Sequence, residues 1–497
     1  MINNIINMFQ PKILIFGLLI FKCSFCTELC KPKVAIIGGG IGGASASHFL
    51  SDLFKDNLKI DLFEKKQLGG RLANVEIGGN EFEAGGAVIH PKNKYMQDFV
   101  KLLDLKKNNH EDSSTLGIWN GDKFVVKLSS WKLISIAKLI YRYGFEPFTL
   151  DRLVTWVLDN FDKIYKLQDN EIAFENVTSL LAAMNADFPG YLTETIKNHL
   201  LNKGISEKLI DELVQATLVV NYGQETNVHS FVGFVSLAGM GANLWSVKGG
   251  NKLVPENLIR QNNRVKIIQS EVEKIRLILK DQDSIEYELS YKKEDDTNII
   301  TDVYDIVIIA RPLTNDQENS IEFEEFPEEG IFTVPGKYQT TIATFVEGKL
   351  NPLHFGLESE IDCILSCNPN KTIVSSIGKV NSVNDNGEKG SSDIWKIFTR
   401  ESMNPKFVNK ILSKVGQVKK IIWKAYPHYS TENRLDKFKL HKGLYHVNAI
   451  EWAASAMEMS AIGGRNVAIL AYKDFKKTCS ATQMKKSEKK KNYSTEF

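Results

Sequence analysis

The glycine-rich segment at residues 38–43, with the sequence GGGIGG, has the spacing of a nucleotide-binding turn. An apolar run at residues 33–37 precedes it, and small residues compatible with a helix follow at 44–50. Gly38 permits a tight turn, Gly40 lets the backbone approach a pyrophosphate, and Gly43 lets the helix pack closely on the strand. The helix N-terminus then presents N–H groups and a positive dipole end to phosphate. The residues predicted to bind phosphate are Gly38, Gly40, Ile41, Gly42 and Gly43.

An acidic residue follows the second apolar run of this segment. Residues 59–63 predict a strand that ends at Glu64, about 20 residues after the last glycine of the turn, which is the usual spacing. A carboxylate in this position accepts hydrogen bonds from the ribose hydroxyls of a dinucleotide. The complete order of strand, glycine turn, helix, strand and acid predicts a dinucleotide site. The alternative is a glycine-rich turn that holds no ligand.

Two further glycine pairs indicate that the dinucleotide is FAD rather than NAD. Gly69 and Gly70 precede Arg71, so this segment adds backbone donors and a cation for a pyrophosphate. Residues 75–82 predict a hairpin around a Gly-Gly-Asn turn. The hairpin leads to Gly85 and Gly86, where the missing side chains let the backbone approach a flat ring system.

These motifs carry a resemblance to known flavoproteins. Glu64 followed by Gly69, Gly70 and Arg71 resembles the flavin amine oxidase and desaturase superfamily. The longer string at residues 61–91, DLFEKKQLGGRLANVEIGGNEFEAGGAVIHP, resembles the prenylcysteine oxidase family, which is also called prenylcysteine lyase. The likeness extends from about residue 33 to residue 473 and includes residues 221–224, 231–233, 244–254, 395–398, 425–429 and 443–462.

The resemblance implies an FAD cofactor and two more residues that bind it. In this superfamily an acid at the position of Glu451 binds the ribityl chain, and the helix after it points its N-terminus at the flavin N1–C2=O edge. The alternative for Glu451 is an acid that stabilises a helix N-terminus. Val272, at the end of a strand predicted for residues 265–272, is the second expected contact. No cysteine or histidine lies in a flavin-attachment motif, so we expect FAD to be bound without a covalent link.

The reaction implied by the resemblance is oxidative cleavage of a thioether. S-prenyl-L-cysteine, carrying a farnesyl or geranylgeranyl group, reacts with O2 and water to give cysteine, a prenyl aldehyde and hydrogen peroxide. Such substrates arise in the degradation of prenylated proteins. Two alternatives stay open: another FAD oxidase of amines or polyenes, and a prenyl-binding escort protein without catalysis, comparable to the Rab GDP-dissociation inhibitors.

No side chain stands out as a catalytic acid, base or nucleophile. His90 and His428 are the histidines nearest the family-like motifs, and each is a weak candidate whose simpler role is structural. The cysteines and histidines show no metal-ligand pairing, and no metal is expected.

The fold class predicted from these elements is α/β. A Rossmann-type FAD-binding domain would be discontinuous and contain residues 31–100, 245–315 and 440–475, with further strands at 304–310 and 443–450. An inserted α+β substrate domain would contain residues 101–244 and 316–439. A signal peptide at 1–26 and a lysine-rich tail at 476–497 would lie outside both domains.

Four segments between the motifs have patterns of their own. Apolar residues spaced three and four apart at 131–165 predict two amphipathic helices. We expect these helices to pack on the substrate domain, and the alternative is contact with a lipid or a membrane surface. The uncharged stretch at 226–247 predicts core, or an apolar wall for a prenyl tail. Residues 280–302 and 381–392 are polar and predict exposed loops or hairpin tips.

The composition describes an ordinary globular protein. The chain has 497 residues, of which 43% are hydrophobic and 25% charged, and this balance excludes a disordered or collagen-like protein. The formal net charge is +2, and lysines after Lys473 supply much of the positive charge. The body is therefore mildly acidic, which argues against nucleic acid as a partner. The lysine-rich end predicts a solvated, mobile tail, and contact with anionic lipid is the alternative.

The N-terminal segment predicts an address in the secretory pathway. Lys12 precedes an apolar run at residues 13–21 that is too short to span a bilayer and is typical of a signal peptide. The mature chain would then begin near Thr27. The lysosome is the expected destination, and secretion is the second possibility. Sequons begin at Asn176, Asn370 and Asn492, and the cysteines that could form disulfides are Cys30, Cys363, Cys367 and Cys479.

Overall fold

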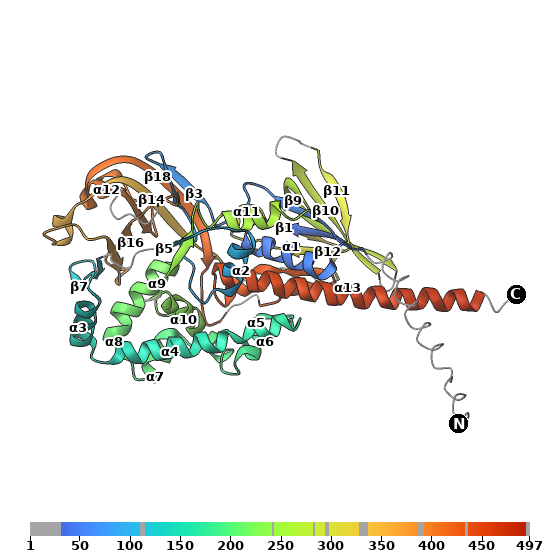
Figure 1. The fold of residues 1–497 in the computed structure, drawn as a ribbon, viewed down its shortest axis with the longest axis horizontal. Helices are drawn as coiled ribbons and strands as arrows, with labels where there is room; N and C mark the ends of the chain where they lie inside the picture. The colour runs from blue at the N-terminus through green and yellow to red at the C-terminus, as the bar shows by residue number, and fades with distance from the viewer. Residues whose placement is uncertain are drawn as a thin grey trace, which may run out of the picture.

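The structure is a computed structural model, and it describes residues 31–109, 115–240, 243–281, 284–293, 298–327, 336–385, 392–432 and 436–493. The predicted signal peptide lies outside these residues. The side chains of the sequon at Asn492 are also not described. Two sheets and a layer of helices make up the body, and a long C-terminal helix projects from it (Figure 1). The α/β class predicted from the sequence is confirmed.

Among the described residues, nine strands form the sheet that carries the glycine turn. The strands run in the order β11-β10-β9-β2-β1-β12-β20-β19, and β13 pairs with β9. Strands β9, β2, β1, β12 and β20 are parallel to one another. The strands are β1 (Lys33–Ile37), β2 (Lys59–Glu64), β9 (Val265–Asp281), β10 (Ser284–Lys293), β11 (Ile300–Tyr304), β12 (Ile306–Ile309), β13 (Glu322–Glu324), β19 (Lys439–His441) and β20 (Leu444–His446).

Helix α1 (Ile41–Phe54) connects β1 to β2 and packs against the C-terminal helix α13 (Met457–Tyr493). The two helices approach closely because small residues line their contact. A Cβ on Gly464 would lie 2.6 Å from the backbone oxygen of Gly42. The middle strands β1 and β12 are apolar and almost fully buried, as expected for a parallel sheet covered on both faces.

A second sheet of seven described strands faces the first across the molecule. Its order is β18-β14-β17-β16-β15-β6-β7, and its neighbours are antiparallel except for β15 and β6. The buried residues of β17 and β14 pack on one another and hold the sheet together. The strands are β6 (Leu116–Trp119), β7 (Phe124–Leu128), β14 (Tyr338–Leu350), β15 (Cys363–Ser366), β16 (Val374–Lys379), β17 (Ile394–Thr399) and β18 (Leu412–Pro427), and α12 (Pro405–Ile411) precedes β18.

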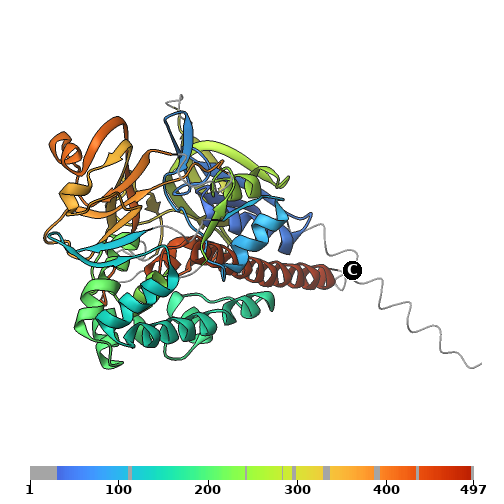
Figure 2. The same ribbon diagram turned by 60° about the vertical axis from the view of Figure 1, so that its left-hand side comes forward.

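A helical layer lies on one side of both sheets, as the two views show (Figures 1 and 2). Its longest helix, α4, runs beside α10. The helices of the layer are α3 (Lys132–Tyr143), α4 (Glu146–Phe161), α5 (Lys163–Asp169), α6 (Val177–Met184), α7 (Ile196–Asn202), α8 (Glu207–Leu209), α9 (Gln215–Tyr222) and α10 (Ser230–Ala238). The connecting elements nearer the first sheet are β3 (Asn74–Ile77), β4 (Asn80–Glu83), α2 (Lys94–Leu102), β5 (Lys107–Asn109), β8 (Trp245–Val247) and α11 (Leu253–Arg260).

The hairpin predicted near residue 78 is confirmed. Strands β3 and β4 pair antiparallel with Ile77 opposite Asn80. Gly78 and Gly79 form the turn with φ of +60° and +76°, a conformation that a two-residue hairpin turn of this type requires.

Three sequence-based expectations about secondary structure are wrong. For residues 280–302 the loop expectation is wrong and the hairpin alternative holds, because β10 and β11 fill most of the segment and β10 pairs antiparallel with both β9 and β11. Charged residues on one face of β10 hid its alternation with the buried Tyr287, Leu289 and Tyr291. The strand expected at 443–450 ends at His446, and Glu451 lies in a 3-10 turn (Val447–Trp452) before α13. The lysine-rich tail continues α13 as helix to Tyr493.

The predicted helices at 131–165 are present as α3, α4 and the start of α5, but α3 packs on the core only through Tyr143 and the partly buried Leu139 and leaves other apolar side chains exposed. Tyr143 is the buried residue of α3, whereas Leu133 and Tyr141 are 81% and 95% exposed. The periodicity predicted an apolar face correctly and could not say whether the protein covers it. No helix among the described residues is long and apolar enough to cross a membrane.

Candidate active site

A cavity of about 870 Å³ lies where the two sheets and the helical layer meet. One end is formed by the glycine turn and the ends of the parallel strands, and another is an apolar arm between helices α4 and α10. Parallel sheets bind ligands beyond the carboxyl ends of their strands, because the chain reverses its direction of winding there. The cavity occupies this position.

The glycine turn contains one position that opens into the cavity. Gly40 caps the N-terminus of α1 with extended backbone, and no side chain caps the helix there. A Cβ on Gly40 would meet no protein atom closer than 3.8 Å, because Gly40 borders the cavity. Packing of the protein therefore does not require glycine here. The space fits a phosphate group held by the N–H groups of the first turn of α1.

The neighbouring glycines are required by packing. Gly38 has φ of +113°, and a Cβ on it would lie 2.6 Å from the backbone oxygen of Ala310. A Cβ on Gly43 would lie 2.0 Å from the backbone oxygen of Gly38, so this glycine lets α1 approach β1. A Cβ on Gly42 would meet Val447 at 2.9 Å. The structure thus assigns the tight turn and the close packing to the glycines expected for them.

Glu64 and Val272 line the nucleotide end of the cavity. Oε2 of Glu64 accepts a hydrogen bond from the backbone N–H of Gly39 at 2.8 Å, and Oε1 accepts one from Lys66 at 3.0 Å. These bonds fix the carboxylate beside the glycine turn. Val272 is buried in β9 nearby. Arg311 also borders this end and was not predicted; burial lowers its pKa although Glu271 lies 3.6 Å away.

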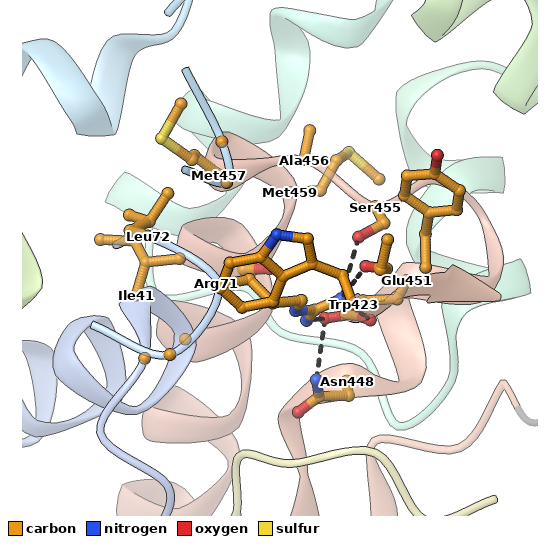
Figure 3. Close-up of a pocket in the computed structure, with 18 of the residues that line it drawn as sticks. Ile41, Arg71, Leu72, Trp423, Asn448, Glu451, Ser455, Ala456, Met457 and Met459 are labelled. Atoms are coloured by element: carbon orange, nitrogen blue, oxygen red, sulfur yellow. Dashed lines mark hydrogen bonds and ion pairs between the residues drawn. The ribbon is translucent and has the colours of Figure 1, made fainter. Parts of the chain in front are cut away.

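Arg71 and Glu451 form an ion pair on the cavity wall, in which Glu451 is buried and the Arg71 side chain is 32% exposed (Figure 3). Glu451 is 1% exposed, and its carboxylate also accepts hydrogen bonds from Tyr338 and Asn448, each at 2.8 Å. Arg71 donates to the backbone oxygen of Ala425 at 2.6 Å. Burial alone would lower the pKa of Arg71, but the adjacent Glu451 carboxylate raises it above its ordinary value. The arginine expected to face a pyrophosphate is therefore directed at Glu451.

The two other predicted glycine pairs border the same wall. Gly69 and Gly70 have φ of +112° and +60°, which other residues rarely adopt. A Cβ on Gly85 would lie 1.9 Å from the backbone oxygen of Arg71, and one on Gly86 would meet Leu72 at 2.8 Å. Gly85 and Gly86 therefore let two backbone segments pack together, and both residues also line the cavity.

The apolar arm is built from two helices of the helical layer. From the stretch predicted as an apolar wall, Phe231, Phe234, Val235 and Leu244 line the arm. Val232, Leu237 and Trp245 are buried elsewhere, and Met240 is partly exposed. Helix α4 supplies the opposite wall through Val157, Leu158 and Phe161, which the sequence placed on an amphipathic helix expected to pack on the core, with lipid contact as the alternative. The spacing of these three residues in the sequence predicts that they share one face of a helix. It does not predict that this face borders a cavity.

The two candidate histidines lie in different places. His90 borders the cavity near Lys92 and Asn93, and its Nδ1 accepts a hydrogen bond from the backbone N–H of Lys92 at 3.0 Å. Burial lowers the pKa of His90. His428 does not line the cavity; its Nδ1 lies 3.1 Å from Oε1 of Gln339. No cluster of metal-ligating side chains occurs among the described residues.

The structure supports a disulfide for one of the predicted cysteines and contradicts it for two. Cys363 and Cys367 are both free, so the local bridge considered for them is absent, and burial raises the pKa of Cys363 to about 12. Cys479 in α13 is disulfide-bonded.

A buried carboxyl group, Glu458, links α13 to α2 at the edge of the cavity. It accepts hydrogen bonds from the backbone N–H groups of Tyr95 and Met96, at 2.7 and 3.0 Å, and from the hydroxyl of Tyr165 at 2.8 Å. Burial raises the pKa of Glu458 to about 7. Sequence reasoning missed it because residues distant in the chain supply its surroundings.

The raised pKa of Glu458 predicts a pH-dependent contribution to stability. Between its ordinary pKa of 4.5 and about 7 the folded chain binds the proton and the unfolded chain releases it, so stability falls as pH rises through this range. The Glu458→Gln variant lacks this titration. Relative to the wild type, its free energy of unfolding should therefore increase between pH 5 and pH 8, by an amount on the order of a few kcal/mol. Its melting temperature should rise relative to that of the wild type over the same range.

The measurement is differential scanning fluorimetry at each pH, with the exposed Glu360→Gln as the matched control. The comparison with the wild type at each pH is needed because burial lowers the pKa of His446 to about 4, which acts in the opposite direction. A constant difference between Glu458→Gln and the wild type across this range would contradict the prediction.

Comparisons with known proteins agree with this architecture. Residues 36–103 match the family model described as an NAD(P)-binding Rossmann-like domain. Among solved structures, a triple mutant of putrescine oxidase has a TM-score of 0.58 at 14% identity, and a protein described as a protoporphyrinogen oxidase from Exiguobacterium has 0.57 at 13%. Each covers 88% of this chain and 98% of its own. At these identities the likeness shows the shared fold.

Closer relatives are found by sequence. The chain is 39% identical over 477 residues to prenylcysteine oxidase 1 of Homo sapiens, with 92% of this chain and 93% of the relative covered. It is 39% identical to prenylcysteine oxidase 1 of Bos taurus, with 88% of both covered, and 33% identical to prenylcysteine oxidase 1-like of Mus musculus, with 88% and 90% covered. The family model described as prenylcysteine lyase matches residues 126–484. The chain therefore belongs to the prenylcysteine lyase family.

Proposed function

We propose that the protein is an FAD-dependent oxidase that cleaves the thioether of S-prenyl-L-cysteine. The observation that carries the proposal is a single cavity in which a dinucleotide-binding turn and an apolar arm meet. The names of the relatives, which cover about nine-tenths of the chain, supply the substrate class. The products are cysteine, a prenyl aldehyde and hydrogen peroxide, formed with one O2 and one water.

The residues of the cavity fit FAD. The open position at Gly40 and the uncapped start of α1 would hold the pyrophosphate, Glu64 a ribose, and Val272 the adenine end. The segments at 69–72 and 84–87, together with Met457 and Met459 at the start of α13, border the space for the flavin ring. Among the described residues no cysteine lines the cavity, and its one lining histidine is His90, which supports the proposal that FAD binds without a covalent link.

The protein's own residues bind and orient the substrate. When bound, FAD accepts two electrons from the substrate and passes them to O2. The apolar arm between α4 and α10 holds the prenyl tail and excludes water from it, which places the carbon next to sulfur toward the flavin end. Each buried CH2 contributes about 0.8 kcal/mol, so affinity should depend on tail length. The allylic double bond and the sulfur stabilise positive charge on that carbon without a protein nucleophile.

The test compares substrates that differ in this double bond. Purified protein should release peroxide from S-farnesyl-L-cysteine. S-octyl-L-cysteine should bind in the apolar arm and release none, because it has no allylic double bond beside its reacting carbon. Equal peroxide release from both compounds would exclude the mechanism.

The exposed apolar face of α3 supports contact with a membrane surface. Trp131, Leu133 and Tyr141 are 73%, 81% and 95% exposed, and Lys132 and Lys138 are interleaved with them. A helix with these side chains binds at a lipid interface. Helix α3 contacts α4, whose other residues line the apolar arm. A prenylated substrate dissolved in lipid would therefore enter the protein close to the membrane.

A vesicle experiment tests this contact. Protein should sediment with phosphatidylcholine vesicles containing phosphatidylserine, and Leu133→Ser combined with Tyr141→Ser should reduce the bound fraction several-fold. The control is Leu353→Ser, which changes an exposed leucine on a different part of the molecule. Sedimentation of the double variant equal to that of the wild type would rule out α3 as the contact.

A secretory address, most directly the lysosome with secretion as a second destination, is part of the proposal. The disulfide at Cys479 supports an oxidising compartment. Asn370 is exposed, and Asn176 caps α6 through its side-chain oxygen, which leaves its nitrogen available for a glycan. N-terminal sequencing of protein from its native host should return a start near Thr27, and mass spectrometry a glycan at Asn176 or Asn370. An intact Met1 without glycan would contradict this address.

A further inference from the structure

Lys396 places a buried ammonium group on the cavity wall. It lies in β17 between Trp395 and Ile397, which are buried on the opposite face, so Lys396 and Phe398 share the face that lines the cavity. Only 6% of Lys396 is exposed. Lysines are almost never buried to this degree unless an anion pairs with them.

The contacts of Lys396 do not include such an anion. Its Nζ donates a hydrogen bond to the backbone oxygen of Glu83 at 2.9 Å and lies 4.7 and 5.5 Å from the ring centroids of Phe398 and Phe345. Among the described residues no carboxylate forms an ion pair with it. An ammonium group has three N–H donors, and the carbonyl of Glu83 accepts one.

The nearest acid, Glu83, attracts Lys396 through space but forms no described ion pair with it. Oε1 of Glu83 accepts a hydrogen bond from the backbone N–H of Asn251 at 2.6 Å. Burial lowers the pKa of Lys396 to about 8 and raises the pKa of Glu83 to about 7. These shifts are expected when the attraction between two buried charges does not offset the loss of their hydration. A ligand carboxylate beside Nζ would supply the missing charge.

Other cations on the cavity wall already have partners. The described ion pairs are Arg71 with Glu451, Lys424 with Asp316, Lys92 with Asp159, and both Lys65 and Arg311 with Glu271. Lys66 is exposed and lies next to Glu64, at the nucleotide end. Lys396 is thus the buried cation of the described wall that lacks a carboxylate.

Lys396 also lies at the reacting end of the cavity. The residue that accepts its hydrogen bond, Glu83, directly precedes the segment at 84–86, which borders the cavity beside Arg71. The apolar lining from α4 and α10 belongs to the same cavity as this segment. A substrate whose tail fills the arm presents its amino-acid head here.

We propose that Lys396 binds the α-carboxylate of the S-prenylcysteine and so makes the site selective for the free amino acid over a peptide or an amide. The inference rests on the proposed function, because it assigns a role within the same substrate site. A charge-assisted hydrogen bond to a carboxylate is stronger than one to a neutral group. An amide in its place would leave the ammonium buried without an opposite charge.

Binding of unreactive probes tests the assignment directly. S-octyl-L-cysteine and its C-terminal amide are titrated into the flavin-loaded enzyme by calorimetry. The wild type should bind the acid roughly 10- to 100-fold more tightly than the amide, the range for a hydrogen bond to a charged group. Lys396→Met should lose this preference, Lys396→Arg should keep it, and Lys419→Met, an exposed residue of the same sheet, should behave as the wild type.

Kinetics separate binding of the carboxylate from a role in the chemical step. With S-farnesyl-L-cysteine, Lys396→Met should raise KM by a similar factor and change kcat little. A lowered kcat with unchanged KM would overturn the proposal. Equal affinity of the wild type for acid and amide would also overturn it, and this comparison does not depend on the folding of a variant. Failure of the wild type to oxidise S-farnesyl-L-cysteine would instead refute the proposed function.

Discussion

Replacing Gly40 by valine should produce a folded protein that contains no flavin. The expectation rests on a difference between this glycine and its neighbours. Valine at Gly38 or Gly43 would collide with backbone atoms, whereas Gly40 has extended backbone and open space around its Cα. A branched side chain would fill the volume that fits the pyrophosphate, next to the start of α1. Binding should therefore be lost without loss of the fold.

The measurement is the absorbance ratio of flavin to protein, with circular dichroism as the check on folding. Gly378→Val is the matched control, because a Cβ there meets no atom within 4 Å and Gly378 lies in β16 and does not line the cavity. Glu64→Ala should be milder and weaken binding by roughly 1.5–3 kcal/mol, the contribution of hydrogen bonds to a charged group. Full flavin content in Gly40→Val would show that this turn does not hold the phosphates.

Replacing Arg71 by methionine should destabilise the protein by about 3–5 kcal/mol, the usual effect of leaving a buried charge, here that of Glu451, without its partner. Glu451 would remain almost fully buried, with Tyr338 and Asn448 as its remaining donors among the described contacts. Because Arg71 also donates to the backbone oxygen of Ala425, the variant should loosen the contact between β18 and the flavin end.

Thermal unfolding of the purified proteins measures this effect. Arg264→Met removes an ion pair to Asp56, whose side chain is 97% exposed, and should change stability by no more than about 1 kcal/mol. Adding Glu451→Gln to Arg71→Met should recover part of the loss, because the unpaired carboxylate is then neutral. If Arg71→Met and Arg264→Met had the same melting temperature, the pair of Arg71 and Glu451 would contribute no more to stability than the exposed pair.

The nucleotide end could be predicted from the sequence because its parts are adjacent in the chain. Gly38, Gly40, Gly43 and Glu64 lie within one strand–helix–strand unit, and each has a role that follows from local geometry. The spacing of the residues therefore reports their arrangement in space. The same is true of the hairpin at Gly78 and Gly79, where the turn conformation dictates glycine.

The substrate end could be predicted only in part, because residues distant in the chain assemble it. Phe231 and Phe234 were expected to line an apolar wall, but the facing wall comes from α4, where Val157 precedes Phe231 by 74 residues. Lys396 looked like an ordinary strand lysine. Its burial follows from the pairing of β17 with β14 and β16, which no local pattern encodes.

The exposed face of α3 shows a further limit of sequence patterns. Apolar residues at helical spacing predict a helix with one apolar face, and this was correct. The pattern does not state what covers that face, since a protein core and a lipid surface select the same residues. The positions of Leu133 and Tyr141 in the structure decide that the protein itself leaves them uncovered.

The central claim is that the cavity joins a flavin to a prenylated cysteine, and anaerobic bleaching of the flavin tests it most directly. Oxygen-free protein is mixed with S-farnesyl-L-cysteine in one cell and with spermine in another, and the flavin absorbance is followed. The account predicts that S-farnesyl-L-cysteine bleaches the flavin and spermine leaves it oxidised. Bleaching by spermine alone would identify an amine oxidase, and an unchanged or absent flavin spectrum with both compounds would indicate a binding protein without this catalysis; either result would contradict the account.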